Sequence, residues 1–343
     1  MYRTVEELLT DLNIATDAFK EDVESQINND NYVASRMLSK AKKFAGKNIE
    51  VPLKYGREHT QSMSEYEQYN LQPRDILDSA YYDIRHLHGD MVLSKKKVDA
   101  QNVGKAQIID LARTRMENLA ETMTNYFSEL LFTSVDDLLT TDPDSLIKLC
   151  ATVNNIVGGI NAATETRFSW NPKVLDYEGV GITFDNLIDP TSTYYVEKLL
   201  RRLIGPLTLG KDKPSVGLST QGFWDAYEIV LRADKRFNDA YKADAGFDTL
   251  TFRSMKIAVD SHVPGGKMNQ VATGLGMFLT LNEKYLGYRF APKVRKWTPW
   301  KEAERQPIYF AMYDWMGNFV CSRRDRQGAI RGLPTDHDVY GTW

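Results

Sequence analysis

Residues 105–142 read KAQIIDLARTRMENLAETMTNYFSELLFTSVDDLLTTD, a run of sequence that contains neither glycine nor proline. Apolar residues recur in it at alternating steps of three and four, the spacing of one face of an α-helix. These residues are Ile109, Ala112, Met116, Leu119, Met123, Tyr126 and Leu130. The spacing predicts one helix of about 28 residues, against an average of about 11–12 in globular proteins. Because the helix has a single apolar stripe, we expect it to lie against a sheet or a neighbouring chain.

A coiled coil is the alternative for this helix, since a coiled coil also needs a long apolar stripe. Asp136 and Asp137 argue that the heptads do not continue beyond Leu131.

Two helices are predicted before this run. The first opens with a capping box formed by Thr4 and Glu7, after which apolar residues follow at helical spacing. They are Leu8, Leu12, Ala15, Phe19 and Val23. The second carries Met37, Leu38, Ala41 and Phe44 and is expected to end at Gly46.

Charge is segregated over these two helices. Residues 1–30 hold eight acidic against two basic residues, a net charge of −6, and residues 31–57 hold seven basic against one acidic, a net charge of +6. Either these are two solvated helix faces, or they form an arm whose halves meet oppositely charged neighbours.

Residues 47–102 show no sustained helical period and predict a long extended excursion. Its tyrosines lie among Gln, Ser, Asn and charged residues: Tyr55, Tyr66, Tyr69, Tyr81 and Tyr82. Tyrosine is enriched at protein interfaces, and an isolated hairpin is marginal in water. The segment therefore predicts a two-stranded flap that needs a partner surface.

From Asp144 to about Tyr288 helices and strands alternate, which predicts a mixed α/β module with its own core. Helices are expected over 145–156, 194–204 and 221–232, the first ending at Gly158–Gly159 and the second at Gly205–Pro206. Strands are expected over 214–219, 249–260 and 277–282.

The last part of the chain predicts a hairpin. Residues 308–315 alternate as a strand, turn near Met316-Gly317-Asn318 and return through 319–321. Residues 289–331 hold ten basic against four acidic residues, and the basic run Arg323-Arg324-Asp325-Arg326-Gln327-Gly328 follows the hairpin. This run is either a solvated basic edge or a contact to an acidic neighbour, for example the N-terminal arm of another copy.

The composition is that of a globular protein. With 42% hydrophobic and 26% charged residues, the 343-residue chain is not disordered and can bury a core without disulfides. A formal net charge of −3 disfavours a dedicated nucleic-acid binder. The two cysteines, Cys150 and Cys321, lie far apart in apolar contexts, which indicates inert thiols in a reducing cytosol. The chain holds no secretory signal and no run of about 18 apolar residues, so no membrane association is expected.

One motif has the spacing of a metal site. In His86-Leu87-His88-Gly89-Asp90, the two histidines and the aspartate share one face of a strand and would converge on a cation, as in a metal-dependent hydrolase. Met91 stands where that hydrolase motif continues with histidine. A plain strand with surface histidines is the favoured interpretation.

Other chemistry-bearing patterns are incomplete. Gly266-Lys267 lacks the first glycine and the hydroxyl residue of a phosphate-binding loop, so Gly265-Gly266 is predicted to be a turn. No dinucleotide fingerprint and no nucleophile elbow is present. We therefore expect no catalytic residues, no cofactor and no bound metal.

The order of these parts resembles the Hong Kong 97-like major capsid proteins of tailed double-stranded-DNA bacteriophages. Short phrases add to the resemblance: IEVPL at 49–53 with Tyr55-Gly56, NVG at 102–104, GFDTLTF at 246–252, LNEKYL at 281–286, and GNFVCS at 317–322 with Arg324, Gln327 and Gly328. Together they cover most of residues 45–330, while residues 1–45 and the tail after Leu333 are not diagnostic.

The resemblance implies an α+β capsid fold in five parts. They are an N-terminal arm (1–46), an extended flap or E-loop with its base strands (47–102), the spine helix of the P-domain (103–144), a mixed α/β axial or A-domain (145–285), and returning P-domain strands with a C-terminal tail (286–343). It further implies a structural protein of the virion, assembled in the bacterial host cytoplasm, that self-assembles into hexamers and pentamers of an icosahedral head around packaged DNA that it does not specifically bind.

Two features of the resemblance bear on partners. With the spine starting near Val103, no room remains for a long scaffolding segment that a protease removes, so a separate scaffold or none is expected, beside a portal and decoration proteins. Lys54 and Lys95-Lys96-Lys97 lie near the flap, but no covalent crosslink is predicted from them. The alternatives are an encapsulin-like compartment shell and, from another class, a hydrolase that uses His86, His88 and Asp90.

Overall fold

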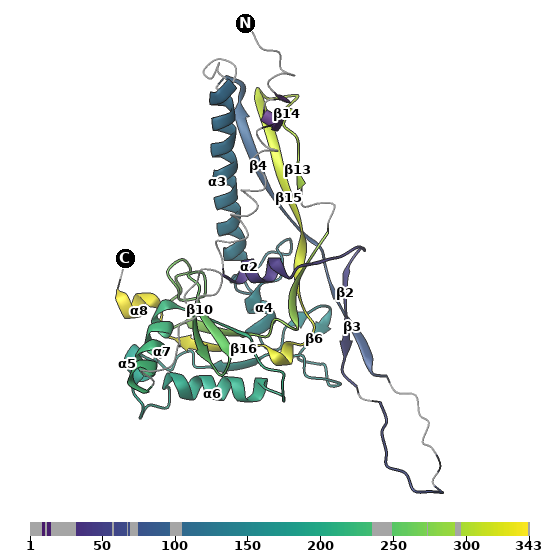
Figure 1. Cartoon of the computed structure of the whole chain (residues 1–343), viewed down its shortest axis with the longest axis vertical. Helices are drawn as coiled ribbons and strands as arrows, with labels where there is room; N and C mark the ends of the chain where they lie inside the picture. The colour runs from purple at the N-terminus through teal and green to yellow at the C-terminus, as the bar shows by residue number, and fades with distance from the viewer. Residues whose placement is uncertain are drawn as a thin grey trace.

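The long helix and the strand beside it form a spine that rises from a lower α/β module (Figure 1). The computed structural model describes residues 9–10, 12–14, 32–56, 58–66, 68, 75–96, 105–234, 249–272, 274–291 and 296–341. A pair of strands projects from the other side of the junction between spine and module. In this elongated arrangement the described residues of the α/β module leave much of the spine and of this projection uncovered.

The spine helix α3 spans Lys105–Leu131, which confirms the predicted single helix of about that length. Its buried stripe lies on β4 (Arg85–Ser94) rather than on another helix, so the coiled-coil alternative is wrong. The stripe consists of Ala112, Met116, Leu119, Met123, Phe127 and Leu130. Phe127 replaces the predicted Tyr126, which is 43% exposed, and the Ile109 side chain lies outside the described residues. Helix and strand approach closely at Gly89, where a Cβ would lie 2.6 Å from Leu119 Cδ1.

The spine sheet is built on one long strand, β15 (Ile308–Cys321), and the predicted hairpin at Met316-Gly317-Asn318 is wrong. β15 pairs antiparallel with the whole of β4 through its residues 308–317. It also pairs with β12 (Leu286–Phe290), β13 (Lys296–Trp297) and β14 (Lys301–Glu302), while β1 (Lys42–Lys43) joins β12 in parallel. The glycine at 317 serves close packing instead of a turn, since a Cβ there would lie 2.2 Å from the Tyr288 hydroxyl oxygen.

The lower module contains a second six-stranded sheet in the order β7-β16-β11-β8-β10-β9. The strands are β7 (Lys173–Asp176), β16 (Gly328–Leu333), β11 (Gly276–Leu281), β8 (Val216–Ser219), β10 (Met255–Val259) and β9 (Thr249–Phe252). Helices α5 (Phe184–Ile188), α6 (Val196–Leu207) and α7 (Gln221–Asp234) pack on it through a separate apolar cluster. The predicted strands near 214–219 and 277–282 and the predicted helix from residue 221 are confirmed.

Three predicted boundaries in this module are wrong. The strand expected over 249–260 is a hairpin that turns at Arg253 and Ser254, both with positive φ. α6 continues past Gly205–Pro206 to Leu207, because its amphipathic face stays buried to that residue. The helix expected over 145–156 ends at Cys150 as α4 (Leu146–Cys150), and a small hairpin of β5 (Ile156–Val157) and β6 (Ile160–Asn161) follows it.

The N-terminal arm is described in part. Residues 9–10 and 12–14 are helical, and Asn13 Oδ1 accepts a hydrogen bond of 2.8 Å from the Trp300 backbone N–H. The remainder of the first predicted helix and most of the acidic half lie outside the described residues. The second helix, α2 (Tyr32–Ser39), ends before the predicted stop at Gly46, because the chain pairs with β12 as β1. No helix within the described ranges has the length and apolar character that crossing a membrane needs.

The C-terminal helix α8 (Asp336–Tyr340) is tied to the module by a long-range helix cap. Asp336 Oδ1 accepts a hydrogen bond of 2.7 Å from the Gly222 backbone N–H, and its Oδ2 accepts one of 3.3 Å from the Gln221 backbone N–H. These donors belong to the first turn of α7, whose N–H groups have no acceptor inside the helix. A carboxylate at this end also interacts favourably with the helix dipole.

We therefore expect Asp336→Ala to lower the free energy of unfolding by about 1–2 kcal/mol, because two buried donors lose their acceptor. Urea denaturation of the unassembled subunit measures the change. His337→Ala is the matched control, since His337 is exposed one residue further along. Equal stability of both variants would show that Asp336 does not cap α7.

Candidate assembly site

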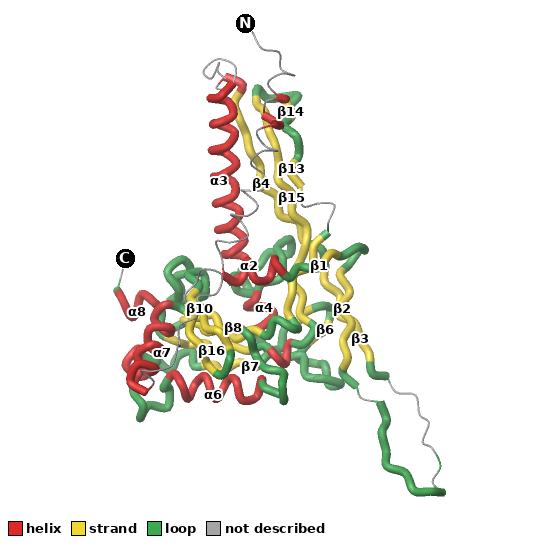
Figure 2. The backbone as a smooth tube through the Cα atoms, viewed as in Figure 1, coloured by secondary structure: helices red, strands yellow, loops and turns green. Residues whose placement is uncertain are grey.

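Two strands form a flap that stands away from the rest of the subunit (Figure 2). We define the flap as residues 49–82, with β2 (Ile49–Lys54) and β3 (Leu77–Tyr82) paired antiparallel over their full length. Among the described residues these strands pair only with each other. The predicted two-stranded flap is thus confirmed, whereas residues 85–94 of the predicted excursion form β4 of the spine sheet.

Within the part of the chain that the structure describes, nothing covers the tip of the flap. Every residue at 58–66 is exposed, and Tyr66 is 92% exposed. At the base, by contrast, one face of the two strands is buried through Ile49, Val51, Leu53, Ala80 and Tyr82. The flap therefore has an anchored base and a free tip.

Tyr82 holds the flap base to the last part of β15. Its hydroxyl donates a hydrogen bond of 2.8 Å to the Cys321 carbonyl and accepts one of 3.2 Å from the Cys321 N–H. Burial raises the pKa of Tyr82 well above its ordinary value, so the hydroxyl stays neutral and serves both bonds. A further hydrogen bond of 2.9 Å runs from the Tyr81 N–H to the Gly158 carbonyl in the turn between β5 and β6.

A second contact at the flap base centres on Arg167. Its guanidinium lies 2.6 Å from Asp78 Oδ2 on β3 and 2.8 Å from Glu165 Oε2. Hydrogen bonds from Arg167 lower the pKa of Glu165 to about 2. The Tyr55 and Phe168 rings stack beside it with centroids 5.3 Å apart. Because the Arg167 side chain is exposed, its ion pairs orient the base more than they stabilise the fold.

The sequence left two interpretations of the basic run at 323–328, a solvated edge or a contact to an acidic neighbour. Both are wrong for Arg324 and Arg326, because these two side chains are buried within the subunit. Arg324 donates hydrogen bonds to five acceptors. They are the carbonyls of Leu149 (2.9 Å), Lys148 (2.9 Å), Thr152 (2.7 Å) and Trp170 (3.1 Å), and Asn155 Oδ1 (2.7 Å). The guanidinium satisfies the C-terminal carbonyls of α4, which is why that helix ends at Cys150 instead of near 156.

The two cysteines lie near Arg324 and are both buried and free, as the sequence predicted. Burial raises the pKa of the Cys321 thiol to about 12 and that of Cys150 well above its ordinary value. Thiols with raised pKa values are poor nucleophiles at neutral pH.

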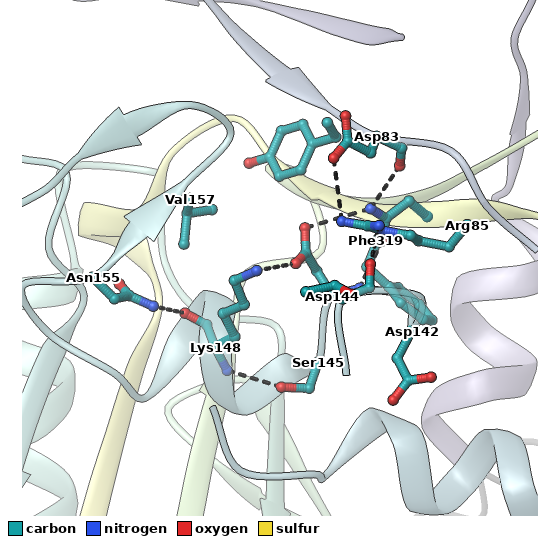
Figure 3. Close-up of polar contacts among 12 residues, drawn as sticks. Asp83, Arg85, Asp142, Asp144, Ser145, Lys148, Asn155, Val157 and Phe319 are labelled. Carbon is teal, nitrogen blue, oxygen red and sulfur yellow. Dashed lines mark hydrogen bonds and ion pairs between the residues drawn. The ribbon is translucent and has the colours of Figure 1, made fainter. Parts of the chain in front are cut away.

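A polar junction beside Arg324 joins spine, module and flap base (Figure 3). Asn318 Oδ1 accepts a hydrogen bond of 2.7 Å from the Asp144 N–H, and Asn318 Nδ2 donates one of 2.9 Å to the Asp83 carbonyl. Asp144 forms an ion pair with Lys148 of α4, and the Ser145 hydroxyl caps that helix at 3.1 Å from the Lys148 N–H. Asn318 therefore links two segments: the one that follows the flap, through Asp83, and the one that precedes α4, through Asp144.

Gln327 extends the junction with a reciprocal pair to the end of β11. Its Oε1 accepts a hydrogen bond of 2.7 Å from the Asn282 N–H, and its Nε2 donates one of 3.1 Å to the Asn282 carbonyl. Sequence reasoning assigned a turn to Asn318 and gave Arg324 and Gln327 no role inside the subunit. The available signal was a cluster of polar residues directly after an apolar strand.

The arm is anchored by a partly buried carboxylate. Glu283 binds Arg36 of α2 in a bidentate pair of 2.7 and 2.9 Å and also lies 3.1 Å from Lys40 Nζ. Ser215 donates a hydrogen bond of 3.1 Å to the same carboxylate. Burial alone would raise the pKa of Glu283, but the hydrogen bonds and charges of Arg36 and Lys40 outweigh it and lower the pKa below its ordinary value of 4.5. Two basic residues of the arm, Arg36 and Lys40, thus pair with a carboxylate of the same subunit.

We expect Glu283→Gln to loosen α2 by about 1–2 kcal/mol, since two cations lose their counter-charge. Because the folded-state pKa is lowered, this stabilisation is present above pH 4.5 and is lost as the pH falls through the lowered pKa. Hydrogen exchange of a peptide covering 32–39 measures both effects. Glu50→Gln is the control, because Glu50 is exposed on β2. Unchanged exchange in Glu283→Gln would contradict the anchor.

The three residues of the hydrolase alternative lie together on one strand. His86, His88 and Asp90 lie on the exposed face of β4, and His86 Nε2 is 3.2 Å from Asp314 Oδ1. Within the described ranges, no group of three or more His, Cys, Asp or Glu side chains is arranged to hold a metal ion. This arrangement favours the plain strand over the hydrolase.

The remaining predicted positions are structural. Gly265, with φ of +89°, forms the predicted turn, and a Cβ on it would lie 2.6 Å from Gly276 Cα. Lys54 is exposed on β2, Lys95 forms an ion pair with Glu302, and Lys97 lies outside the described residues.

No protein-family model matches the chain, and no curated protein matches it in sequence. Solved structures do match over nearly the whole chain. The capsid of cyanophage A-1(L) is 13% identical over 86% of this chain and 90% of that chain, with a TM-score of 0.60. The capsid of a native GTA particle is 9% identical over 87% and 90%, with a TM-score of 0.57.

A third match is to an encapsulin complex. The SrpI encapsulin of Synechococcus elongatus is 12% identical over 90% of both chains, with a TM-score of 0.51. The chain therefore has the fold of these capsid and encapsulin subunits, and that fold is the one the resemblance implied.

Proposed function

We propose that the chain is the major capsid protein of a tailed double-stranded-DNA bacteriophage, and that it assembles into hexamers and pentamers of an icosahedral head. The observation that carries this proposal is the flap, whose base is anchored and whose tip is exposed on its own subunit. A hairpin that stands alone is marginal in water, so a neighbouring subunit is the natural cover for it. The similarity of fold to capsid subunits supports the same conclusion.

The proposal assigns a role to each part of the chain. The arm (1–46) contacts neighbouring subunits, the flap and its base strands (47–102) overlap an adjacent subunit, and the axial domain (145–285) surrounds the capsomer axis. The spine helix (103–144) and the returning strands (286–343) form the peripheral domain. In this division the subunit acts as a structural protein of the virion, not as an enzyme, and it assembles in the host cytoplasm.

The charge of the chain suits a shell around DNA. With a formal net charge of −3, the subunit lines a DNA-filled cavity without binding the DNA tightly. A separate scaffold, a portal and decoration proteins complete the proposed set of partners.

Negative-stain microscopy of the expressed protein tests the proposal, with closed particles or capsomers as the expected result. A compact monomer at every concentration in sedimentation would contradict it. Strong, salt-dependent binding of free subunits to duplex DNA would contradict the passive role toward DNA.

An encapsulin-like compartment is the second candidate, because the match to the SrpI encapsulin spans 90% of both chains. The two candidates differ in content rather than in fold. Particles purified from the native source would contain nucleic acid in the first case and a cargo protein in the second, which nuclease treatment and mass spectrometry distinguish.

A further inference from the structure

A cleft lies where the lower end of the spine meets the α/β module, and its lining includes Thr152, whose carbonyl accepts a hydrogen bond from Arg324. It encloses about 670 Å³, within the range of sites that bind small ligands or peptide side chains. One wall is the end of α3 with the segment 132–137, and the other is the turn-rich segment 262–277. We name it the elbow cleft.

The apolar part of the elbow cleft is unusually open. Met268 is 60% exposed and Leu275 is 38% exposed, both on the 262–277 wall. Methionine is flexible and polarisable, and it is frequent on surfaces that accept peptides of varied sequence. Behind these side chains lie Ile147, Pro264 and Met277, so an apolar side chain that entered would be enclosed.

The rim of the elbow cleft is acidic. Glu129, Asp136 and Asp137 are exposed on the spine wall. On the opposite wall Glu178 is paired with Arg331 at 2.5 Å, so that cation is already compensated. The rim therefore repels phosphate-bearing ligands and attracts lysine or arginine side chains.

Two buried polar atoms of the lining residues, Arg331 Nε and His262 Nε2, have no hydrogen-bond partner among the residues that the structure describes. Both atoms are closed to solvent, so they do not face the open cleft, and recognition by the cleft rests on its apolar lining and its acidic rim.

From this combination we propose that the elbow cleft binds a short amphipathic segment of a separate protein, with apolar side chains against Met268 and Leu275 and basic side chains toward Glu129 and Asp136. A second copy of this chain is a poorer occupant. Its described basic segment is engaged, because Arg36 and Lys40 bind Glu283 and residues 42–43 pair as β1. The inference goes beyond shell formation and holds for free subunits and shells alike.

The test uses the full chain and a fluorescein-labelled synthetic helix of about four turns, with leucines on one face and lysines on the other. Fluorescence anisotropy is expected to show binding that weakens with added salt. A scrambled peptide of the same composition, and one with glutamates in place of the lysines, are expected to bind at least about 10-fold more weakly.

Three variants locate the binding. Met268→Asp is expected to weaken binding by about 10-fold and Asp136→Asn by about 2–3-fold, whereas Ile229→Asp on α7, an exposed apolar position outside the cleft, leaves it unchanged. Equal binding of the scrambled peptide, or full binding to Met268→Asp, would overturn the proposal. A change in the oligomeric state of Met268→Asp without peptide would assign the cleft to a second copy and also overturn it. Microscopy of the same samples reports shell formation separately.

Discussion

Replacing Arg324 with methionine is expected to lower the free energy of unfolding by about 4 kcal/mol or more. Methionine fills much of the volume of the side chain but donates no hydrogen bond. Five acceptors lose the Arg324 donor, four of them backbone carbonyls around α4 and Trp170, although the Lys148 carbonyl keeps a hydrogen bond of 3.1 Å from Asn155 Nδ2. Water reaches them poorly, because Arg324 is fully buried. An unsatisfied buried acceptor costs about 1–3 kcal/mol, so even partial relaxation leaves a large loss.

Urea denaturation of unassembled subunits measures this loss, with Arg323→Met as the matched control. Arg323 is the neighbouring residue, but it is partly exposed, and its contacts are an ion pair of 2.8 Å with Asp325 and a position 5.4 Å from the Tyr285 ring centroid. Its replacement is expected to change the free energy of unfolding by less than about 1 kcal/mol.

A second substitution at the same position, to lysine, keeps the prediction testable if the methionine variant fails to fold. Arg324→Lys retains the charge and three donors at one point, whereas the acceptors surround a planar fork. We expect a loss of about 2 kcal/mol, intermediate between wild type and Arg324→Met. Similar stability of all three proteins would mean that the guanidinium does not hold the junction.

The elements that the sequence predicted well are those whose signal is local and periodic. The 3–4 spacing from Ala112 to Leu130 was enough for α3, and apolar runs were enough for β8 and β11. The helix predicted from residue 145 begins where expected, but nothing local predicted its end at Cys150. That end depends on Arg324, a residue more than 170 positions away in the chain.

Glycine misled the sequence interpretation where it serves packing. Gly317 was taken for a turn between two short strands, although it lies inside the long strand β15. Its lack of a side chain admits the Tyr288 ring, a contact between strands that no local pattern encodes. Gly89 has the same role against Leu119 on α3.

The candidate assembly site divides in the same way. The tyrosine-rich, aperiodic flap was predictable because its composition suits an interface and its length suits no loop of a compact domain. The junction of Asn318, Arg324 and Gln327 was not predictable, because the hydrogen bonds that hold it join residues far apart in the chain. A single sequence indicates an exposed interface more readily than it indicates the buried polar network that orients this interface.

Replacing residues 56–75 with Asn-Gly is expected to abolish closed shells while leaving the subunit folded. Tyr55 and Ile76 already share a backbone hydrogen bond of 3.2 Å, so a two-residue turn can join the strands at that point. The described residues of the tip are almost entirely exposed, hence their removal costs the subunit little. We expect a change in the free energy of unfolding of less than about 1 kcal/mol.

Shell formation is scored by negative-stain microscopy and sedimentation, with wild type assembled in parallel. A second variant replaces residues 57–75 with a Gly-Ser linker of equal length, which keeps the reach of the flap but removes its side chains. If side chains such as Tyr66 make the contact with the neighbour, neither variant forms shells. If the backbone alone made it, the linker variant would still assemble. Closed particles from the Asn-Gly variant would show that the flap is dispensable, and the assembly role proposed for it would then be wrong.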